Sequence, residues 1–219
     1  MRVRALALPV RRSNGFVLFA ATVAAALALW LVVAFPAQAK AATVHLNGVQ
    51  TTLTTDPATT ALLFGAGIIP LPVWPTAVAP TAHAASYTFP ITGGRVNAKT
   101  LAGRIYHSGG LLLAQYTTPT TMPSSWKALA LTKFTIRITA SPNLTAVVNG
   151  GPRLAIATLD LSSAKITRFV RHHHAYVRIA NVEVDLNATA VGAVNTTFGT
   201  HLAAPVDLGT ATVLARVGR

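Results

Sequence analysis

The most conspicuous polar cluster in the sequence is a run of three histidines, His172, His173 and His174. Neutral imidazole is a common metal ligand, so this run is the first candidate for a metal site. On a strand, successive side chains point to opposite faces, so only His172 and His174 could share one ion. Two imidazoles leave a zinc site incomplete, because such sites use three or four protein ligands. We therefore favour a solvated turn between two strands over a metal site.

A fourth histidine, His107, ends a stretch over residues 101–107 in which apolar or small side chains alternate with polar ones. This period predicts a strand with His107 on the inner face and with Arg104 and Tyr106 on the other face. A lone histidine on an apolar face is more often a hydrogen-bonded core residue than a ligand. We take His107 and Tyr106 as candidate ligand-binding residues, although Tyr106 could reach the same pocket only through a bulge.

Residues for acid–base or nucleophilic catalysis are scarce. The chain has only five carboxylates, and Asp56 among them is expected to cap a helix. The sequence contains no G-x-S-x-G elbow, no phosphate-binding P-loop, no G-x-G-x-x-G followed by a helix and no H-E-x-x-H zinc motif. We therefore predict that the protein is not an enzyme.

The N-terminal segment has the features of an export signal. The first 15 residues hold four arginines and no acid, and residues 16–35 are apolar except for Thr22. Pro36 and the sequence Ala37-Gln38-Ala39 follow, which favours a signal peptide over residues 1–39, cut before Lys40 or two residues later. The alternative is an uncleaved anchor, because residues 16–35 are long enough to cross a hydrocarbon core of about 30 Å. We expect one domain, residues 40–219, secreted or held at the cell surface.

The composition predicts a folded, basic domain without disulfides. The chain is 52% hydrophobic and 11% charged, and it has no cysteine. From Lys40 onward, fourteen basic residues against five acidic ones give a net charge of +9. This surplus predicts attraction to anionic cell-envelope polymers or lipid headgroups, with solubility alone as the alternative. The basic residues are scattered along the sequence without interleaved aromatics, so nucleic acid is not expected as a partner.

Apolar alternation and turn residues predict mostly strands. The predicted strands lie at 43–53, within 86–113, and at 127–139, 144–149, 153–161, 165–170 and 176–186. Short helices are expected at 56–65, opened by Asp56 and Pro57, and at 188–198, ended by Gly199. Four prolines predict an irregular surface loop over 68–85. The alternation changes phase near Thr132 and Ala180, which predicts bulges there.

These elements define the fold class as mainly β. About eight to eleven strands with few helices fit an antiparallel β-sandwich or an open barrel with two short helices, after the N-terminal signal segment.

Four segments in the middle of the chain resemble the successive strands of HtaA-type domains, which are exported β-rich modules of Gram-positive bacteria that bind haem. The segments are 103–111, 131–138, 144–149 and Arg153 to Ser162, within a match over about residues 101–190. In that family the first strand carries a tryptophan and the tyrosine that ligates the haem iron, and the strand at 43–53 has neither. His107 matches the family's histidine, which implies that it partners the ligand or lines the pocket.

The resemblance implies a non-catalytic bacterial protein, secreted or at the cell surface, whose apolar pocket takes haem or another flat apolar ligand. The missing tyrosine leads us to expect weak or absent haem binding. The alternative is a structural or adhesive cell-envelope protein with no small ligand. Either protein would contact a membrane only through residues 16–35, and only if they are not removed.

Overall fold

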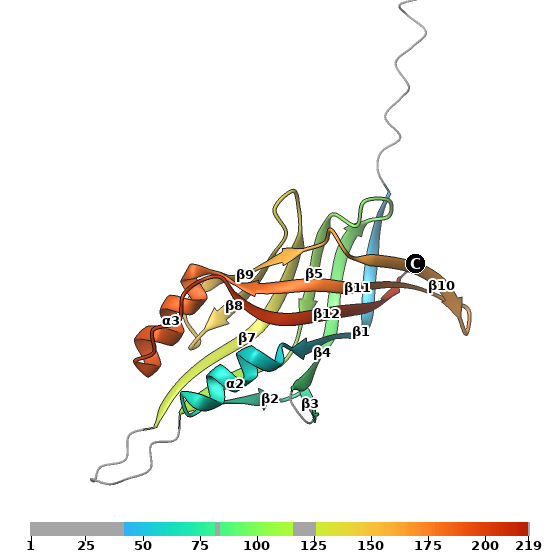
Figure 1. Ribbon diagram of the computed structural model, residues 1–219. Helices are drawn as coiled ribbons and strands as arrows, with labels where there is room; N and C mark the ends of the chain where they lie inside the picture. The colour runs from blue at the N-terminus through green and yellow to red at the C-terminus, as the bar shows by residue number, and fades with distance from the viewer. Residues whose placement is uncertain (1–41, 82–83, 116–125, 219) are drawn as a thin grey trace, which may run out of the picture. The chain divides into compact units, whose positions relative to one another are not determined.

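Strands dominate the structure, a computed structural model that describes residues 42–81, 84–115 and 126–218 (Figure 1). The predicted signal segment and the whole Thr/Pro/Ser-rich stretch at 117–125 lie outside the described residues. In chain order the elements are β1 (Thr43–Thr55), α2 (Pro57–Gly65), β2 (Ile68–Val73), β3 (Ala77–Pro80), β4 (Ala85–Asn97), β5 (Gly103–His107), β6 (Gly110–Gln115), β7 (Lys127–Ile138), β8 (Asn143–Val148), β9 (Arg153–Asp160), β10 (Lys165–Arg171), β11 (His174–Leu186), α3 (Ala188–Phe198) and β12 (Val206–Val217).

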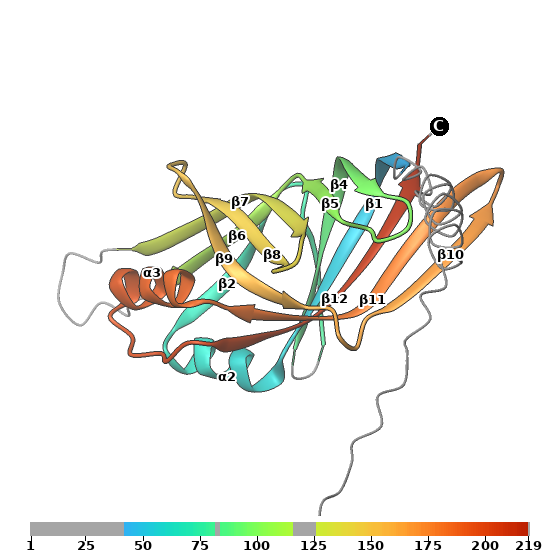
Figure 2. The same cartoon turned by 90° about the horizontal axis from the view of Figure 1, so that it is seen from above.

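Eight of the strands close into an antiparallel ring in the order β7-β5-β4-β1-β12-β11-β9-β8 (Figure 2). The ring is completed where β8 pairs with the second edge of β7. Four strands extend this ring: β6 on β7, β2 on β6, β3 on β4, and β10 on β11. The predicted mainly β class with two short helices is confirmed. Of the two expected architectures, the barrel is the one found, and its ring is closed.

The two helices begin and end as the sequence predicts. Asp56 accepts a hydrogen bond from the backbone N–H of Thr59 at 2.8 Å, and Pro57 occupies the first helical position of α2. Asn187 caps α3 in the same way, with the N–H of Ala190 at 3.0 Å. Gly199 ends α3 in the left-handed conformation, with φ at 74°.

Both predicted bulges are present. The register of β7 against β8 shifts between Thr132 and Thr135, where Lys133 has a φ of 52°. The register of β11 against β12 shifts between Ile179 and Val182, where Asn181 has a φ of 59°. Each extra residue changes which side chains face inward, so the apolar pattern stays directed at the core on both sides of the bulge.

The predicted irregular loop at 68–85 is wrong, because this segment forms the strands β2 and β3. The prolines are tolerated since, among the described strands, β2 pairs with β6 on one edge and with no strand on the other. Pro70 and Pro72 lie opposite Leu113 and Leu111, at alternate positions, so both ring nitrogens point toward the unpaired edge. An edge strand does not need the N–H groups that proline lacks.

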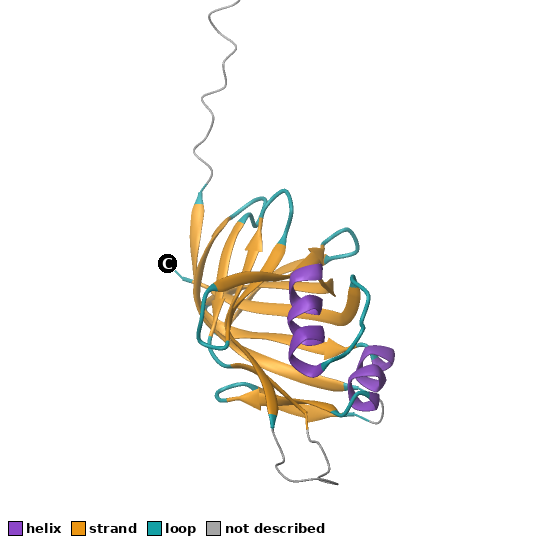
Figure 3. Cartoon of the chain, turned by 90° about the vertical axis from the view of Figure 1, so that its left-hand side faces the viewer, coloured by secondary structure: helices purple, strands orange, loops and turns teal. Residues whose placement is uncertain are grey.

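Apolar side chains from every strand of the ring meet in its interior. Leu46, Ile105 and Val213 are almost completely buried, and the rings of Phe89 and Phe134 meet edge to face with centroids 5.0 Å apart. Both helices lie toward the same end of the ring (Figure 3), where α3 packs on β7, β9 and β11 and α2 packs on β2 and β12. Within the described ranges, no helix is long and apolar enough to span a membrane.

Candidate functional site

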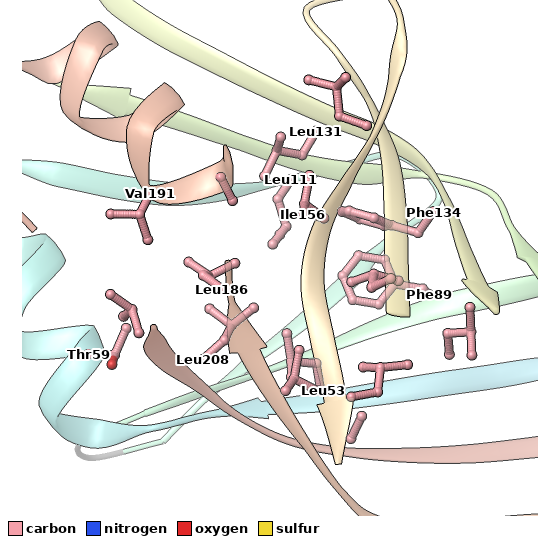
Figure 4. Close-up of a pocket in the computed structure, with 18 of the residues that line it drawn as sticks. Leu53, Thr59, Phe89, Leu111, Leu131, Phe134, Ile156, Leu186, Val191 and Leu208 are labelled. Carbon is pink, nitrogen blue, oxygen red and sulfur yellow. The ribbon is translucent and has the colours of Figure 1, made fainter. Parts of the chain in front are cut away.

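The interior of the ring contains a cavity of about 110 Å³ that extends toward the two helices (Figure 4). Its walls are leucine, isoleucine, valine and phenylalanine side chains from both halves of the barrel. The strands contribute Leu53, Phe89, Leu111, Leu131, Phe134, Ile156, Leu186 and Leu208, and α3 contributes Val191. A cavity with such a lining stays dry or holds an apolar ligand, because water would find few hydrogen-bond partners there.

Among the described residues, four polar side chains line this cavity: Thr51, Thr59, Thr189 and His107. Thr59 donates its hydroxyl hydrogen to the backbone carbonyl of Asp207. His107 is 6% exposed, and both ring nitrogens are engaged. Its Nδ1 lies 3.3 Å from the carbonyl oxygen of Phe134, and its Nε2 lies 2.8 Å from Oγ1 of Thr51.

The partners of His107 fix the position of its proton. A carbonyl oxygen only accepts, so Nδ1 donates to Phe134 and Nε2 accepts from the Thr51 hydroxyl. Burial in the apolar interior lowers the pKa of His107 to about 4, although the bond to the Phe134 carbonyl opposes the shift. His107 is therefore a neutral, fully hydrogen-bonded imidazole near pH 7.

The structure separates the two candidate ligand-binding residues. His107 faces the cavity, as the strand period predicts, whereas Tyr106 faces outward and is 43% exposed. The irregularity beside Tyr106 lies in β4, whose register shifts between Ile91 and Gly93, whereas β5 itself pairs with β7 without a shift, so Tyr106 stays outward. The pair is thus not brought together, and only His107 remains in the candidate site.

The three adjacent histidines form the turn that the sequence favours. His172 and His173 connect β10 to β11 with φ values of 48° and 62°, and His174 opens β11 opposite Arg171. All three side chains are exposed. In the part of the chain that the structure describes, no group of three histidine, cysteine or acidic side chains lies close enough to hold a metal.

Sequence reasoning missed Thr51 and the part of the lining at the end of the ring where the helices lie. Thr51 and His107 are 56 positions apart, and their side chains meet on the inner face across the intervening strand β4. The one signal was the position of Thr51, two residues before the inward Leu53 in an alternating strand. The contributions of Val191 and Leu208 depend on the chain path around the ring, which no local pattern encodes.

The lining does not fit haem. Protein ligands of haem iron are histidine, cysteine, methionine and tyrosine, and His107 is the one such residue in the cavity wall. Both of its nitrogens already have partners, so ligation would require Thr51 or Phe134 to be displaced. Within residues 42–81, 84–115 and 126–218, no lysine or arginine lines the cavity to meet acidic substituents. The volume is also well below the roughly 300–1,000 Å³ of pockets for drug-sized ligands.

A closed antiparallel ring around an apolar cavity places the domain among the small β-barrels that enclose a ligand-sized space. No family model matches the chain, and no curated protein matches it. Among solved structures, the C-terminal domain of HtaA from Corynebacterium glutamicum aligns at a TM-score of 0.51 and 16% identity, over 80% of this chain and 99% of that one. The heme binding protein HtaB from the same organism aligns at 0.48 and 13% identity, over 80% and 96%. The chain thus has the HtaA fold, which confirms the architecture implied by residues 101–190.

Proposed function

We propose that this protein is a non-catalytic binding module that holds a small apolar molecule inside its β-ring and works outside the cytoplasm. The observation that carries the proposal is the cavity inside the ring, whose described walls are apolar except for three threonines and one neutral histidine. No carboxylate of the described chain lines the cavity, and the one titratable group in its described lining, His107, is held by two hydrogen bonds. Such a lining supports binding rather than acid–base chemistry.

The chemistry of the walls defines the ligand class. An uncharged molecule with few polar atoms loses little on leaving water, whereas a charged group would enter this cavity without a partner. An engineered apolar cavity of about 150 Å³ binds benzene, so a space of this size takes a single ring or a short chain. We therefore propose a neutral ligand of that size, in preference to haem, in the described structure.

Native mass spectrometry of the protein purified from its host tests this proposal. We expect an adduct that leaves on denaturation, and binding of one equivalent of the neutral single-ring fluorophore 4-(dimethylamino)benzonitrile. Ala193→Phe fills the cavity from α3 and should abolish both signals, since Ala193 lines the space. Ala188→Phe is the matched control, because Ala188 is exposed at the start of the same helix.

The competing function is a structural or adhesive envelope protein with no small ligand. It predicts no adduct, and equal fluorophore binding by the wild type and both variants. That pattern would overturn the proposed binding function.

A further inference from the structure

Three arginines form a row across adjacent strands on the outer face of the ring. Arg95 of β4 lies directly opposite Arg104 of β5, and Arg104 lies directly opposite Arg137 of β7. His45 of β1 extends the row on the other side, opposite Arg95. The residues before and after each arginine face the core, so all four side chains share the outer face. We call these four residues the arginine row.

The positive charge of the arginine row is not neutralised within the described part of the chain. Arg95 donates through Nη2 to Nε2 of His45 at 3.4 Å. The acceptor is thus an imidazole nitrogen and not a carboxylate. Arg104 and Arg137 have no side-chain partner in the described residues, and Nε of Arg137 is buried without an acceptor. On the next strand, β8, the residue opposite Arg137 is the uncharged Asn143.

The acidic residues are gathered on other strands. Asp160 lies opposite Glu183, and Asp185 lies opposite Asp207, on β9, β11 and β12. The fifth, Asp56, caps α2. Like charges directly opposite each other destabilise a sheet, and a carboxylate beside any of the three arginines would have relieved this cost. The fold keeps two consecutive arginine pairs instead, which points to a negative partner from outside the domain.

Further positive charge lies beside the arginine row. The turn between β4 and β5, two residues from Arg95, presents the exposed Lys99. Arg168 of β10 reaches this turn and donates to the carbonyls of Ala98 and Lys99 at 3.1 and 3.4 Å. The positive surface therefore joins residues that are about seventy positions apart, which is why the sequence shows no basic cluster.

We propose that the arginine row is a binding site for a linear polyanion that carries phosphate groups. Neighbouring strands lie about 4.8 Å apart, so the three guanidinium groups span roughly 10 Å in a line across the sheet. A tetrahedral phosphate offers oxygens in several directions and can accept from guanidinium groups on adjacent strands, whereas a planar carboxylate pairs best with one. The site does not depend on a ligand in the cavity.

The test measures binding of the purified exported protein to long-chain inorganic polyphosphate, with polyglutamate, oligothymidylate and orthophosphate as comparisons. The row variant combines Arg95→Gln, Arg104→Gln and Arg137→Gln. The matched control combines Lys165→Gln, Arg171→Gln and Arg178→Gln, which removes the same charge from the exposed β10–β11 hairpin. Thermal unfolding of each variant checks the fold. We expect the row variant to unfold no earlier than the wild type, because two like-charge pairs are removed.

We expect the row variant to bind polyphosphate at least ten-fold more weakly, and the hairpin variant less than three-fold more weakly. The slope of log affinity against log salt should fall by about 2 in the row variant, in line with two to three lost phosphate contacts. Equal losses in the two variants would reduce the effect to net charge and overturn the proposal. Tighter binding of polyglutamate than of polyphosphate at equal charge would overturn the phosphate assignment, and so would a wild type that binds none of the four probes. Oligothymidylate also carries its phosphates in a line, so its binding should weaken in the row variant and not in the hairpin variant.

Discussion

The single titratable group in the cavity gives the molecule a defined response to acid. His107 has a pKa near 4 in the folded state, because burial disfavours the imidazolium, and near 6.5 in the unfolded chain. Its folded pKa is depressed, so the unfolded state binds the proton more tightly. The stability associated with neutral His107 is therefore complete above pH 6.5 and is lost as the pH falls from 6.5 toward 4.

We expect His107 to account for a loss of roughly 3 kcal/mol in the free energy of unfolding between pH 7 and pH 4, by the linkage relation. Urea unfolding at several pH values measures this loss. In His107→Gln the component should disappear, while His201→Gln, an exposed histidine, should leave it intact. An unchanged pH profile in His107→Gln would contradict the assignment of a buried neutral imidazole.

The same residue decides the haem hypothesis. We expect weak or no haem binding, because His107 is already bonded to Thr51 and Phe134 and no tyrosine lines the cavity. If a Soret shift occurs on titration, His107→Ala should weaken it and the outward Tyr106→Phe should not. The paired substitutions His172→Ala and His174→Ala are the control, because they remove any haem binding at the exposed histidine turn. A tight complex that ignores His107 and is lost in Tyr106→Phe or Tyr176→Phe would contradict this site.

At the residue scale, strand period alone placed His107 inward and Tyr106 outward. It could not supply Thr51 as the partner of His107, because a hydrogen bond between positions 51 and 107 depends on the order of strands in the sheet. The arginine row was hidden for the same reason. Its members are isolated in the sequence and become neighbours only through the pairing of β4 with β5 and of β5 with β7.

At the scale of elements, local signals succeeded where the backbone itself sets the structure. The cap at Asp56, the end of α3 at Gly199 and the two changes of phase could all be predicted from the sequence, since each reflects nearest-neighbour geometry. The prediction of an irregular loop at 68–85 was wrong because prolines exclude a central strand but not an edge strand. Whether a strand lies at an edge is a property of the whole sheet.

The approach of β4 to β5 provides a test of element packing. A Cβ atom at Gly103 would lie 2.0 Å from the carbonyl oxygen of Arg95, so the two strands would have to separate. We expect Gly103→Ala to lower the free energy of unfolding by at least 1–3 kcal/mol, as overpacking does. Gly192→Ala is the control, because nothing lies within 4 Å and the residue is inside α3. It should stabilise by roughly 0.5–1 kcal/mol, and equal effects of the two substitutions would contradict the close approach.

For the whole molecule, the alternating strands fit two architectures equally well, because a sandwich and a barrel both bury one face of each strand. Pairing between the two ends of the chain decides between the sandwich and the barrel. Leu46 to Thr55 in β1 match Val217 to Gly209 in β12, and the β7–β8 pairing closes the other side. These contacts span most of the sequence, so they could not be read from any local window.

The closed ring also constrains where the chain can be cut during export. The carbonyl of Ala42 accepts from the N–H of Ala98 at 2.8 Å, and β1 begins at Thr43. Cleavage after Ala39 or Ala41 therefore removes no residue of β1, a central strand of the ring. We expect N-terminal sequencing of the exported protein to begin at Lys40 or Ala42, and we expect Ala37→Leu with Ala39→Leu to slow processing at the alanine-flanked site. If Met1 is still present in membrane fractions and these substitutions change nothing, residues 16–35 are an anchor, and the cavity and the arginine row act at the membrane surface.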